Sequence, residues 1–180
     1  MRKKGLLIIC ILMATTAISQ SPDSLITNLK DVQVMEGTWV GQGWIMGNTG
    51  KKMRFQQTEI INSKVNGHVF MIEGLGYAIE DSVVTDRVIH DVVGMISINP
   101  TSGNATMLAI LEKQGRSEVD LYRLGGEDIF QWSIESPHNG ATVRFTDDLT
   151  DPNQWHEIGE VSIGKGQWYQ FFEMSLTKQQ

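Results

Sequence analysis

The feature that most constrains this fold is a succession of short extended stretches that runs from residue 36 to the end of the 180-residue chain. In each stretch apolar and polar residues alternate with the period of two that is typical of β-strands. Ten strands are predicted, at residues 37–46, 51–62, 68–77, 88–99, 105–114, 117–124, 129–135, 141–146, 155–163 and 167–177. The Gly, Asn, Pro and Ser clusters between them are short, and connections this short join antiparallel neighbours.

Ten sequential antiparallel strands must protect the two edges of their sheet, and closure into an up-and-down barrel removes both edges. A two-sheet sandwich is the alternative, but it usually needs longer crossover connections. The chain offers a long irregular connection only at residues 78–87. We therefore predict an all-β fold, a ten-stranded antiparallel up-and-down β-barrel, with residues 78–87 beside the mouth of its cavity.

Residues 1–19 have the three regions of a secretory signal peptide. A basic region at residues 2–4 precedes an apolar run at 5–13 and a stretch of small residues that ends at Ser19. Cleavage is predicted before Gln20. A retained anchor is the alternative, but the apolar run is short for a bilayer. We expect an exported protein, periplasmic or extracellular, with no membrane insertion after cleavage.

Cleavage at this point would leave an acidic protein without cysteine. The chain has 15 Lys and Arg against 21 Asp and Glu, and the signal removes three basic residues, which leaves 12 and a net charge of −9. Such a protein lacks the basic footprint of a nucleic-acid binder, and an anionic membrane surface would repel it. Cys10 leaves with the signal, so the mature form has no disulfide, thiol nucleophile or thiolate metal site.

Residues 20–35 are predicted to form a short N-terminal helix or linker before a single barrel domain at residues 36–178. Ser21 is a candidate N-cap, with Pro22 at the first helical position. Apolar residues then recur at helical spacing on one face: Leu25, Leu29 and Val32. Such a helix would lie across one end of the barrel as a lid or plug, and a frayed linker is the alternative.

The start of the first predicted strand resembles that of a known group of barrels. Residues 35–43, Met-Glu-Gly-Thr-Trp-Val-Gly-Gln-Gly, are similar to the Gly-Thr-Trp-x-Gly-x-Gly start of nitrobindin-type barrels and of secreted bacterial lipocalin-like families. The placement of Glu59, of the hairpin at 99–100 and of the aromatic strand at 167–169 is similar in layout. The resemblance implies a ten-stranded calycin barrel (lipocalin or fatty-acid-binding-like) with a ligand cavity.

Haem is not implied by this resemblance. Nitrobindin-type barrels hold haem through a histidine close to the C-terminus, whereas the last histidine here is His156 and the terminal strand contains none. We therefore expect no cofactor.

Twelve residues are candidates for ligand contact. They are Trp39, Gly41, Gly43, Phe55, Gln57, Glu59, Met71, Glu73, Trp132, Arg144, His156 and Glu173. If the faces that carry Glu59 and Glu73 both point inward, two carboxylates share one cavity, with raised and split pKa values that suit acid–base chemistry. The alternative is that they face solvent, or that one of them pairs with an arginine such as Arg144.

The aromatic and glycine candidates on the first strand have structural interpretations as well. Trp39 is interpreted mainly as a plug where the barrel begins. Gly41 and Gly43 lie on the same strand face as Trp39, where glycines either let a strand coil sharply or leave interior room.

No metal site or catalytic motif is predicted. Four histidines are scattered without metal-ligand spacing: His68, His90, His138 and His156. The acidic run at 147–151 lacks the central glycine and alternating ligands of an EF-hand and is interpreted as a hairpin turn. The sequence contains no Gly-x-Ser-x-Gly nucleophile motif.

Three functions remain open on these grounds. The first is an exported binding protein whose partner is a small apolar or amphipathic molecule held in the cavity. The second is a filled-barrel structural or interaction protein with an aromatic surface patch. The third is an acid–base enzyme that uses Glu59, Glu73, His156 or Glu173, because a fold of this kind does not exclude catalysis.

Overall fold

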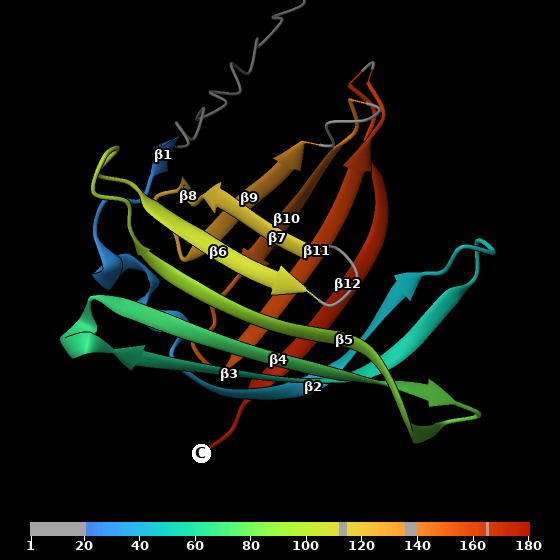
Figure 1. Ribbon diagram of the computed structural model, residues 1–180. Coiled ribbons are helices and arrows are strands. Elements are labelled where there is room, and N and C mark those ends of the chain that lie inside the picture. Colours follow the sequence, from blue (N-terminus) through green and yellow to red (C-terminus); the bar gives the residue numbers. More distant parts are fainter. Residues whose placement is uncertain (1–20, 112–114, 136–139, 165) are drawn as a thin grey trace, which may run out of the picture.

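The computed structural model describes residues 21–111, 115–135, 140–164 and 166–180, and these form one antiparallel sheet of 12 strands (Figure 1). The strands are β1 (Ser21–Leu25), β2 (Gly37–Met46), β3 (Lys52–Lys64), β4 (Val69–Glu80), β5 (Val83–Ile98), β6 (Ala105–Leu111), β7 (Gly115–Asp120), β8 (Tyr122–Gly125), β9 (Ile129–Glu135), β10 (Thr142–Asp148), β11 (Gln154–Ser162) and β12 (Tyr169–Lys178). Two short 3₁₀ helices accompany them, η1 (Leu29–Met35) and η2 (Val65–Gly67).

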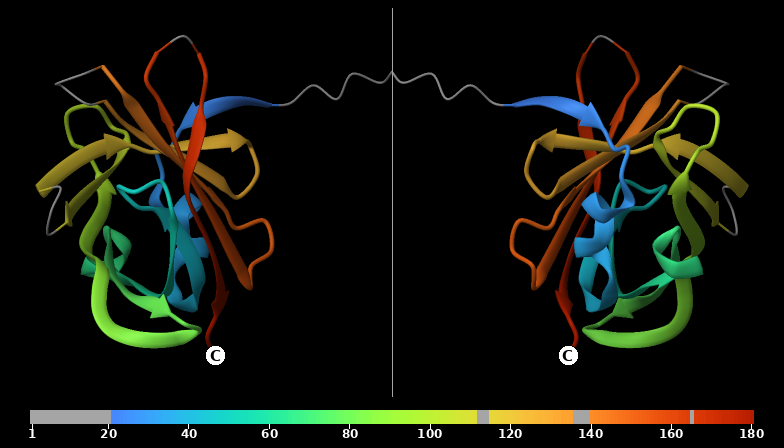
Figure 2. Two further views of the ribbon diagram at one scale, coloured as in Figure 1. Left: turned by 90° about the vertical axis from the view of Figure 1, so that its right-hand side faces the viewer. Right: turned by 90° about the vertical axis from the view of Figure 1, so that its left-hand side faces the viewer.

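The sheet coils into a near-closed up-and-down barrel (Figure 2). Its strand order is β1-β8-β9-β10-β11-β12-β2-β3-β4-β5-β6-β7, so almost every strand lies beside its neighbour in sequence. The last strand returns to the first long one, where Thr177 of β12 lies opposite Val40 of β2. Within the described residues no ladder joins β7 to β9, and this seam keeps the barrel from closing completely. The predicted all-β, antiparallel, barrel-like class is confirmed.

Backbone hydrogen bonds of Ile26, the residue that follows β1, span the open seam near Leu121, which lies between β7 and β8. The amide of Ile26 donates to the carbonyl of Leu121 at 3.0 Å, and the amide of Ala105 donates to the carbonyl of Ile26 at 2.6 Å. Ile26, Ala105 and Leu121 are all buried. The seam is therefore bridged at one end by the residue that follows β1.

The predicted number of ten strands is wrong, because the structure has 12. One additional strand is β1, and the other arises because the predicted strand at 117–124 is divided into β7 and β8 at Leu121. The amide of Leu121 donates to the carbonyl of Ala105 at 3.0 Å while its side chain is 1% exposed. The break at Leu121 places β7 at one edge of the sheet and β8 between β1 and β9.

The predicted N-terminal helix from Ser21 is wrong as well. Residues 21–25 form β1 against β8, and only residues 29–35 are helical, as a 3₁₀ helix whose N-cap Asn28 accepts a hydrogen bond from the amide of Lys30 at 3.0 Å. The buried residues of η1 repeat every third position: Leu29, Val32 and Met35. That is the period of a 3₁₀ helix and differs from the 3.6 of an α-helix. The proline in β1 is compatible with a strand at the end of a sheet.

Residues 78–87 do not form the irregular connection that we predicted. β4 continues to Glu80 and β5 begins at Val83, so only Asp81 and Ser82 separate them. Both have a positive φ, 50° and 67°, which is the conformation of a two-residue type I′ hairpin turn. Asp-Ser lacks the Asn-Gly signature of such turns, and for this reason the sequence pattern missed the hairpin. In Figure 1 this hairpin and the β2–β3 hairpin project from the same side of the barrel.

Replacing Asp81-Ser82 with Asn-Gly is expected to raise the free energy of unfolding by about 1 kcal/mol, because Gly adopts the positive φ of Ser82 without steric cost and Asn-Gly is the favoured pair of this turn. Urea denaturation followed by tryptophan fluorescence measures the change. An Ala-Ala replacement serves as the control and is expected to destabilise. A lower stability for Asn-Gly than for the natural pair would contradict the turn geometry.

Several predictions fall outside the described residues. These are the signal peptide with its cleavage before Gln20, Cys10, the end of the predicted strand at 105–114 and the turn that contains His138. Among the residues that the structure describes, no helix has the length and apolar character needed to cross a membrane.

Candidate functional site

One end of the barrel interior is filled by closely packed, buried side chains. Inward-facing residues of six strands are at most 4% exposed there: Trp39, Ile61, Phe70, Ile96, Phe130 and Leu176. The indole Nε1 of Trp39 donates to the carbonyl of Met35 in η1 at 2.8 Å, and the ring of Trp155 stands edge-on to the Trp39 ring at 5.8 Å. This end, which η1 covers, is a plug in which Trp39 is completely buried.

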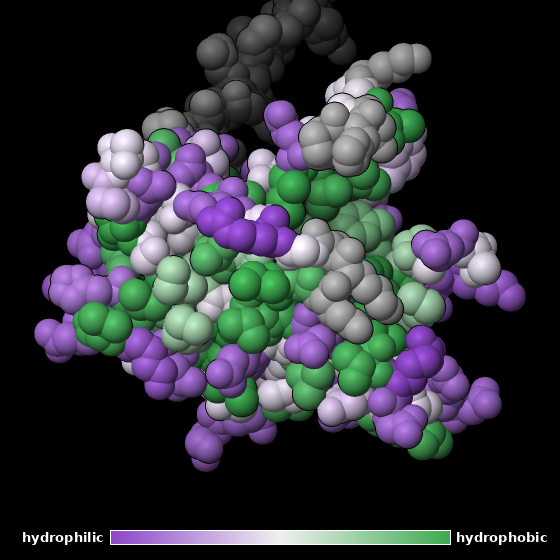
Figure 3. All heavy atoms as spheres, in the orientation of Figure 1, coloured by the Kyte–Doolittle hydropathy of each residue, from purple (hydrophilic) through white to green (hydrophobic). Residues whose placement is uncertain are grey.

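The inner face toward the other end is aromatic and only half-buried. Trp132 stacks on Phe145 with ring centroids 4.3 Å apart, and Phe172 stacks on Phe55 at 5.7 Å. Phe145 and Phe172 meet edge-on at 5.8 Å. Phe55 is buried, whereas the other three rings retain exposure although they line the interior. These three rings therefore keep contact with solvent at this end of the barrel, which we call the aromatic mouth. In Figure 3 apolar side chains gather in the middle of the view and polar ones surround them.

Three carboxyl groups lie between the plug and the aromatic mouth. Glu59 of β3, Asp147 of β10 and Glu157 of β11 are 5%, 3% and 8% exposed. Asp147 and Glu157 are direct partners across the β10–β11 ladder, and Glu59 lies opposite Trp39 in the β2–β3 ladder. Each of the three is within electrostatic range of another. Together with the buried Gln57 they form what we call the interior acidic cluster.

The interior acidic cluster is poorly compensated. Gln57 Nε2 donates to Glu59 Oε1 at 2.7 Å, and Trp155 Nε1 donates to Asp147 Oδ1 at 3.0 Å. Across the described residues, no ion pair reaches any of the three carboxyl groups, and the Oε1 atom of Gln57 is buried without a partner. Buried polar groups that lack partners destabilise a fold, so their presence points to a role other than stability.

Burial also determines the protonation of the cluster. Loss of solvent raises the pKa of Glu59 from its ordinary 4.5 to about 7, opposed by the hydrogen bond from Gln57 and assisted by the charge of Asp147. Burial raises the pKa of Asp147 to about 6, against hydrogen bonding from Trp155 and Trp132. The pKa of Glu157 is raised well above its usual range by burial and then by the charges of Asp147 and Glu59. The cluster therefore holds protons near neutral pH and titrates as a coupled unit.

Glycines on the neighbouring strand make room for the cluster. A Cβ on Gly74 would stand 2.5 Å from Glu59 Oε1, and a Cβ on Gly76 would collide with Gln57 Oε1. Both glycines belong to β4, which pairs with β3. The polar ends of Gln57 and Glu59 thus lie against bare β4 backbone.

The two glycines of β2 have a different effect. A Cβ on Gly41 would collide with the carbonyl of Ser175 and stand 2.8 Å from the Cα of Leu176, and one on Gly43 would stand 2.6 Å from the Phe55 ring. They allow the close approach of β12 and of a core ring, and the space beside them is filled.

The structure separates the twelve candidate residues by face. Seven line the interior or lie beside it: Trp39, Gly41, Gly43, Phe55, Gln57, Glu59 and Trp132. The other five are on the outer face: Met71, Glu73, Arg144, His156 and Glu173. On β4 the inner face carries Phe70, Gly74 and Gly76, so Glu73 is exposed and does not join Glu59. Both faces of β4 carry apolar residues, and alternation alone could not distinguish them.

The outer-face residues have partners of their own. Arg144 Nε lies 2.8 Å from Glu160 Oε2, and its guanidinium lies 3.9 Å from the centre of the Trp168 ring. His156 Nε2 lies 3.3 Å from Glu173 Oε1, and this hydrogen bond is the largest of the influences that lower the pKa of Glu173. His156 and Glu173 were separate candidates in the sequence, and the structure brings them together on the outside of the barrel.

Sequence reasoning missed Asp147 and Glu157. Asp147 was assigned to an acidic turn, but it is the last inward-facing position of β10. Glu157 belongs to the series Trp155-x-Glu157-x-Gly159, which alternates along β11 and is buried at each of these positions. That alternation was the available signal, and it required placing Glu157 on the same face as Trp155.

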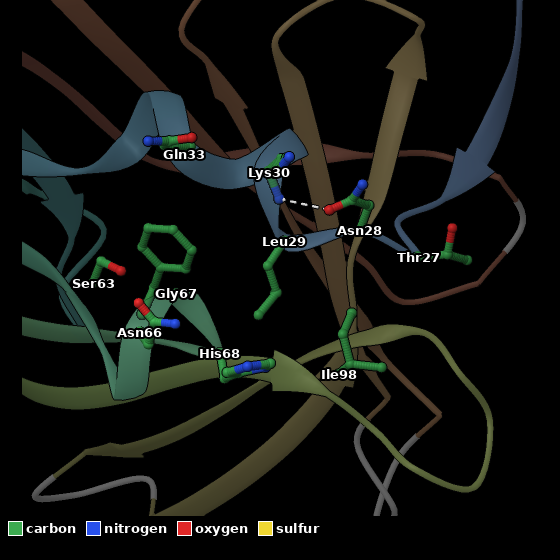
Figure 4. A pocket seen from close by; sticks show the side chains of 11 residues that line it. Thr27, Asn28, Leu29, Lys30, Gln33, Ser63, Asn66, Gly67, His68 and Ile98 are labelled. Carbon is green, nitrogen blue, oxygen red and sulfur yellow. Dashed lines mark hydrogen bonds between the residues drawn. The ribbon is translucent and has the colours of Figure 1, made fainter.

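A separate pocket of about 370 Å³ lies outside the barrel at the plugged end, between η1 and the η2 turn (Figure 4). Asn28, Lys30 and Gln33 line one wall, His68 lies on the other, and the side chain of Leu29 points between them. None of the residues that line it belongs to the interior acidic cluster. Its polar lining residues are exposed apart from the half-buried Ser63, so it lacks the buried, unpaired groups of the interior.

Metal binding finds no support in the arrangement. Over the described ranges no three His, Cys, Asp or Glu side chains are placed to hold a metal ion together. The interior acidic cluster is included in that statement.

Comparison with known proteins identifies the fold class. No family model matches the chain, and no curated protein matches it. The structure is similar to that of Rv2717c from M. tuberculosis, with a TM-score of 0.61 and 10% identity over 87% of this chain and 100% of that one. It is also similar to the S-type phycobiliprotein lyase CPES from Guillardia theta, with a TM-score of 0.57 and 7% identity over 85% and 93% of the two chains.

A third similar structure is a protein of unknown function from the DUF3598 family of Nostoc punctiforme PCC 73102, with a TM-score of 0.50 and 12% identity over 89% of this chain and 53% of that one. At these identities the likeness concerns the fold alone. The chain shares with these structures the fold of a near-closed antiparallel β-barrel.

Proposed function

We propose that this protein is an exported calycin-like barrel that binds a small apolar or amphipathic molecule in its interior. The observation that carries the proposal is the half-exposed aromatic mouth above a set of buried, uncompensated polar groups. Small-molecule sites usually have this composition, with apolar walls and a few polar groups that orient the ligand. The predicted signal peptide supports export to the periplasm or the cell exterior.

The interior favours this function over a filled structural barrel. Replacing buried charged groups with apolar residues is often neutral or stabilising. Three buried acids are therefore not expected in a purely structural core. One of the similar folds is named a phycobiliprotein lyase, which supports the proposal only as a use of the same fold. Kinship with nitrobindin-type families and the absence of a cofactor stay predictions.

The first test is native mass spectrometry of the chain from Gln20, purified from an exporting host and then extracted under denaturing conditions. A defined additional mass that is released on unfolding is expected. A protein that carries no additional mass and also fails to bind any member of a panel of lipids and haem would contradict the proposal. That result would favour the filled-barrel interaction protein.

A paired substitution locates the site. Trp132→Leu is expected to weaken binding of any ligand so identified by at least about tenfold, because the ring forms part of the aromatic mouth. The matched control is Trp44→Leu on the outer face, where the indole donates to Glu173 at 3.0 Å, and this variant should bind as the natural protein does. Equal losses in the two variants would place the ligand elsewhere.

A further inference from the structure

We propose that the interior selects a ligand with an amine head group, whose N–H groups bind the interior acidic cluster while its apolar body lies in the aromatic mouth. The proposal rests on the proposed function, since it names the chemical class of the ligand for the same cavity. It concerns Gln57, Glu59, Asp147 and Glu157.

The cluster offers hydrogen-bond acceptors and has already used its donors. Gln57 Nε2 is engaged with Glu59, and Trp155 Nε1 is engaged with Asp147. The Oε1 atom of Gln57 remains without a partner although its residue is only 1% exposed. Carboxylates accept hydrogen bonds, so the group that would complete this site is a donor, and a cationic donor forms the stronger bond.

The nearby basic side chains of the described chain do not supply that donor. Lys178 Nζ lies 4.9 Å from the centre of the Trp39 ring, beyond the plug. Arg144 pairs with Glu160 on the outer face, and Arg54 donates to Gln42 at 3.0 Å. His90 shares the inner face of β5 opposite Gly76, but burial lowers its pKa and keeps it uncharged near neutral pH. Among the described residues no side chain forms an ion pair with the three acids, and we assign that role to the ligand.

The surroundings favour an amine over the other small cations and over a fatty acid. Among the residues described, no metal-binding group is present, which disfavours a bare metal ion. Aromatic rings lie on the same inner face of the barrel as the acids, and such rings attract organic cations and accommodate apolar tails. An anionic head group would face three acids and a protein of net negative charge.

Three ligands that share one tail provide the test: octylamine, octanol and octanoic acid, titrated by calorimetry near pH 7.5. Octylamine is expected to bind at least about tenfold more tightly than octanol, and octanoic acid more weakly than either. If none of the three binds, the proposed function fails for ligands of this size. If octanol or octanoic acid binds as tightly as octylamine, the interior binds small molecules and the amine proposal alone is overturned.

Substitution of the acids separates the cluster from the rest of the protein. The triple variant Glu59→Gln, Asp147→Asn, Glu157→Gln is expected to lose the preference and to bind octylamine no more tightly than octanol. The matched control is Glu73→Gln, which removes an exposed carboxyl from the outer face and should keep the full preference. Loss of the preference in the control, or its retention in the triple variant, would overturn the assignment.

Proton release provides a readout that does not depend on mutants. The titratable groups that face the site are Glu59 on β3, Asp147 on β10, Glu157 on β11 and His90 on β5. An ammonium group favours the ionised carboxylates, so octylamine should displace protons and bind more tightly at about pH 8 than at about pH 5. Octanol affinity should change little over this range. Octylamine binding without proton release would contradict contact with the acids, even if the triple variant fails to fold.

Discussion

Trp39→Ala is expected to lower the free energy of unfolding by about 3–5 kcal/mol, the usual effect of removing a large buried aromatic side chain. The indole is completely buried at the plugged end of the barrel. Its removal leaves a cavity, abolishes the 2.8 Å hydrogen bond to Met35 and takes away the edge-on contact with Trp155. Because Met35 belongs to η1, the substitution also loosens the cover of this end.

Urea denaturation followed by far-ultraviolet circular dichroism measures the effect without relying on the lost tryptophan. Trp39→Phe keeps a ring but leaves the Met35 carbonyl without its donor, and a smaller loss is expected. Trp44→Ala on the outer face is the control for removal of an indole as such, because Trp44 is only half-buried. A loss below about 1 kcal/mol for Trp39→Ala would show that the plug does not depend on this side chain.

The protein is expected to be more stable at about pH 5 than at about pH 8. A carboxyl group whose pKa is higher in the folded than in the unfolded state keeps its proton longer when folded, so folding becomes less favourable as the pH rises. Glu59 has an ordinary pKa of 4.5 and a folded value of about 7, and between these limits the loss is on the order of 3 kcal/mol. Asp147 and Glu157 act in the same direction.

His90 acts in the opposite direction. Burial lowers its pKa in the folded state, so the unfolded state binds the proton more readily and the protein loses stability as the pH falls. One histidine opposes three carboxyl groups, so the decline toward high pH should dominate. Glu59→Gln removes one of the three carboxyl groups with a raised pKa and should make stability depend less on pH, whereas Glu73→Gln on the outer face should leave the dependence intact. The midpoints of urea denaturation at the two pH values measure this pH dependence of stability. Equal midpoints in the natural protein would contradict the burial of the three acids.

The sequence pattern predicted strands best where one face is clearly apolar. β2 has the predicted bounds. On β3 the alternation placed Phe55, Gln57 and Glu59 on one face, whereas it left open whether that face points inward. The N-terminal segment was harder, because β1 becomes a strand only through its pairing with β8, about a hundred residues away. Local propensity contains no information about such a partner.

The candidate site was predictable only in part for a related reason. On β4 the inner face is marked by Gly74 and Gly76, and these are informative only once Glu59 and Gln57 are known to need the space. Asp147 and Glu157 reach Glu59 from strands far along the chain, and spacing in sequence does not reveal that convergence. Individual acids could be named from the sequence, but the cluster could not.

The ladder between β2 and β12 determines when this protein can fold. Val40 lies opposite Thr177, so the first long strand obtains its second neighbour only after the last strand has been synthesised. Until then β2 presents an unpaired edge, and pairing between such distant segments is slow. A nascent chain would therefore stay incomplete on the ribosome until β12 has emerged. A protein truncated before β12 is expected to remain unfolded and to aggregate through the open edges of β2 and β11.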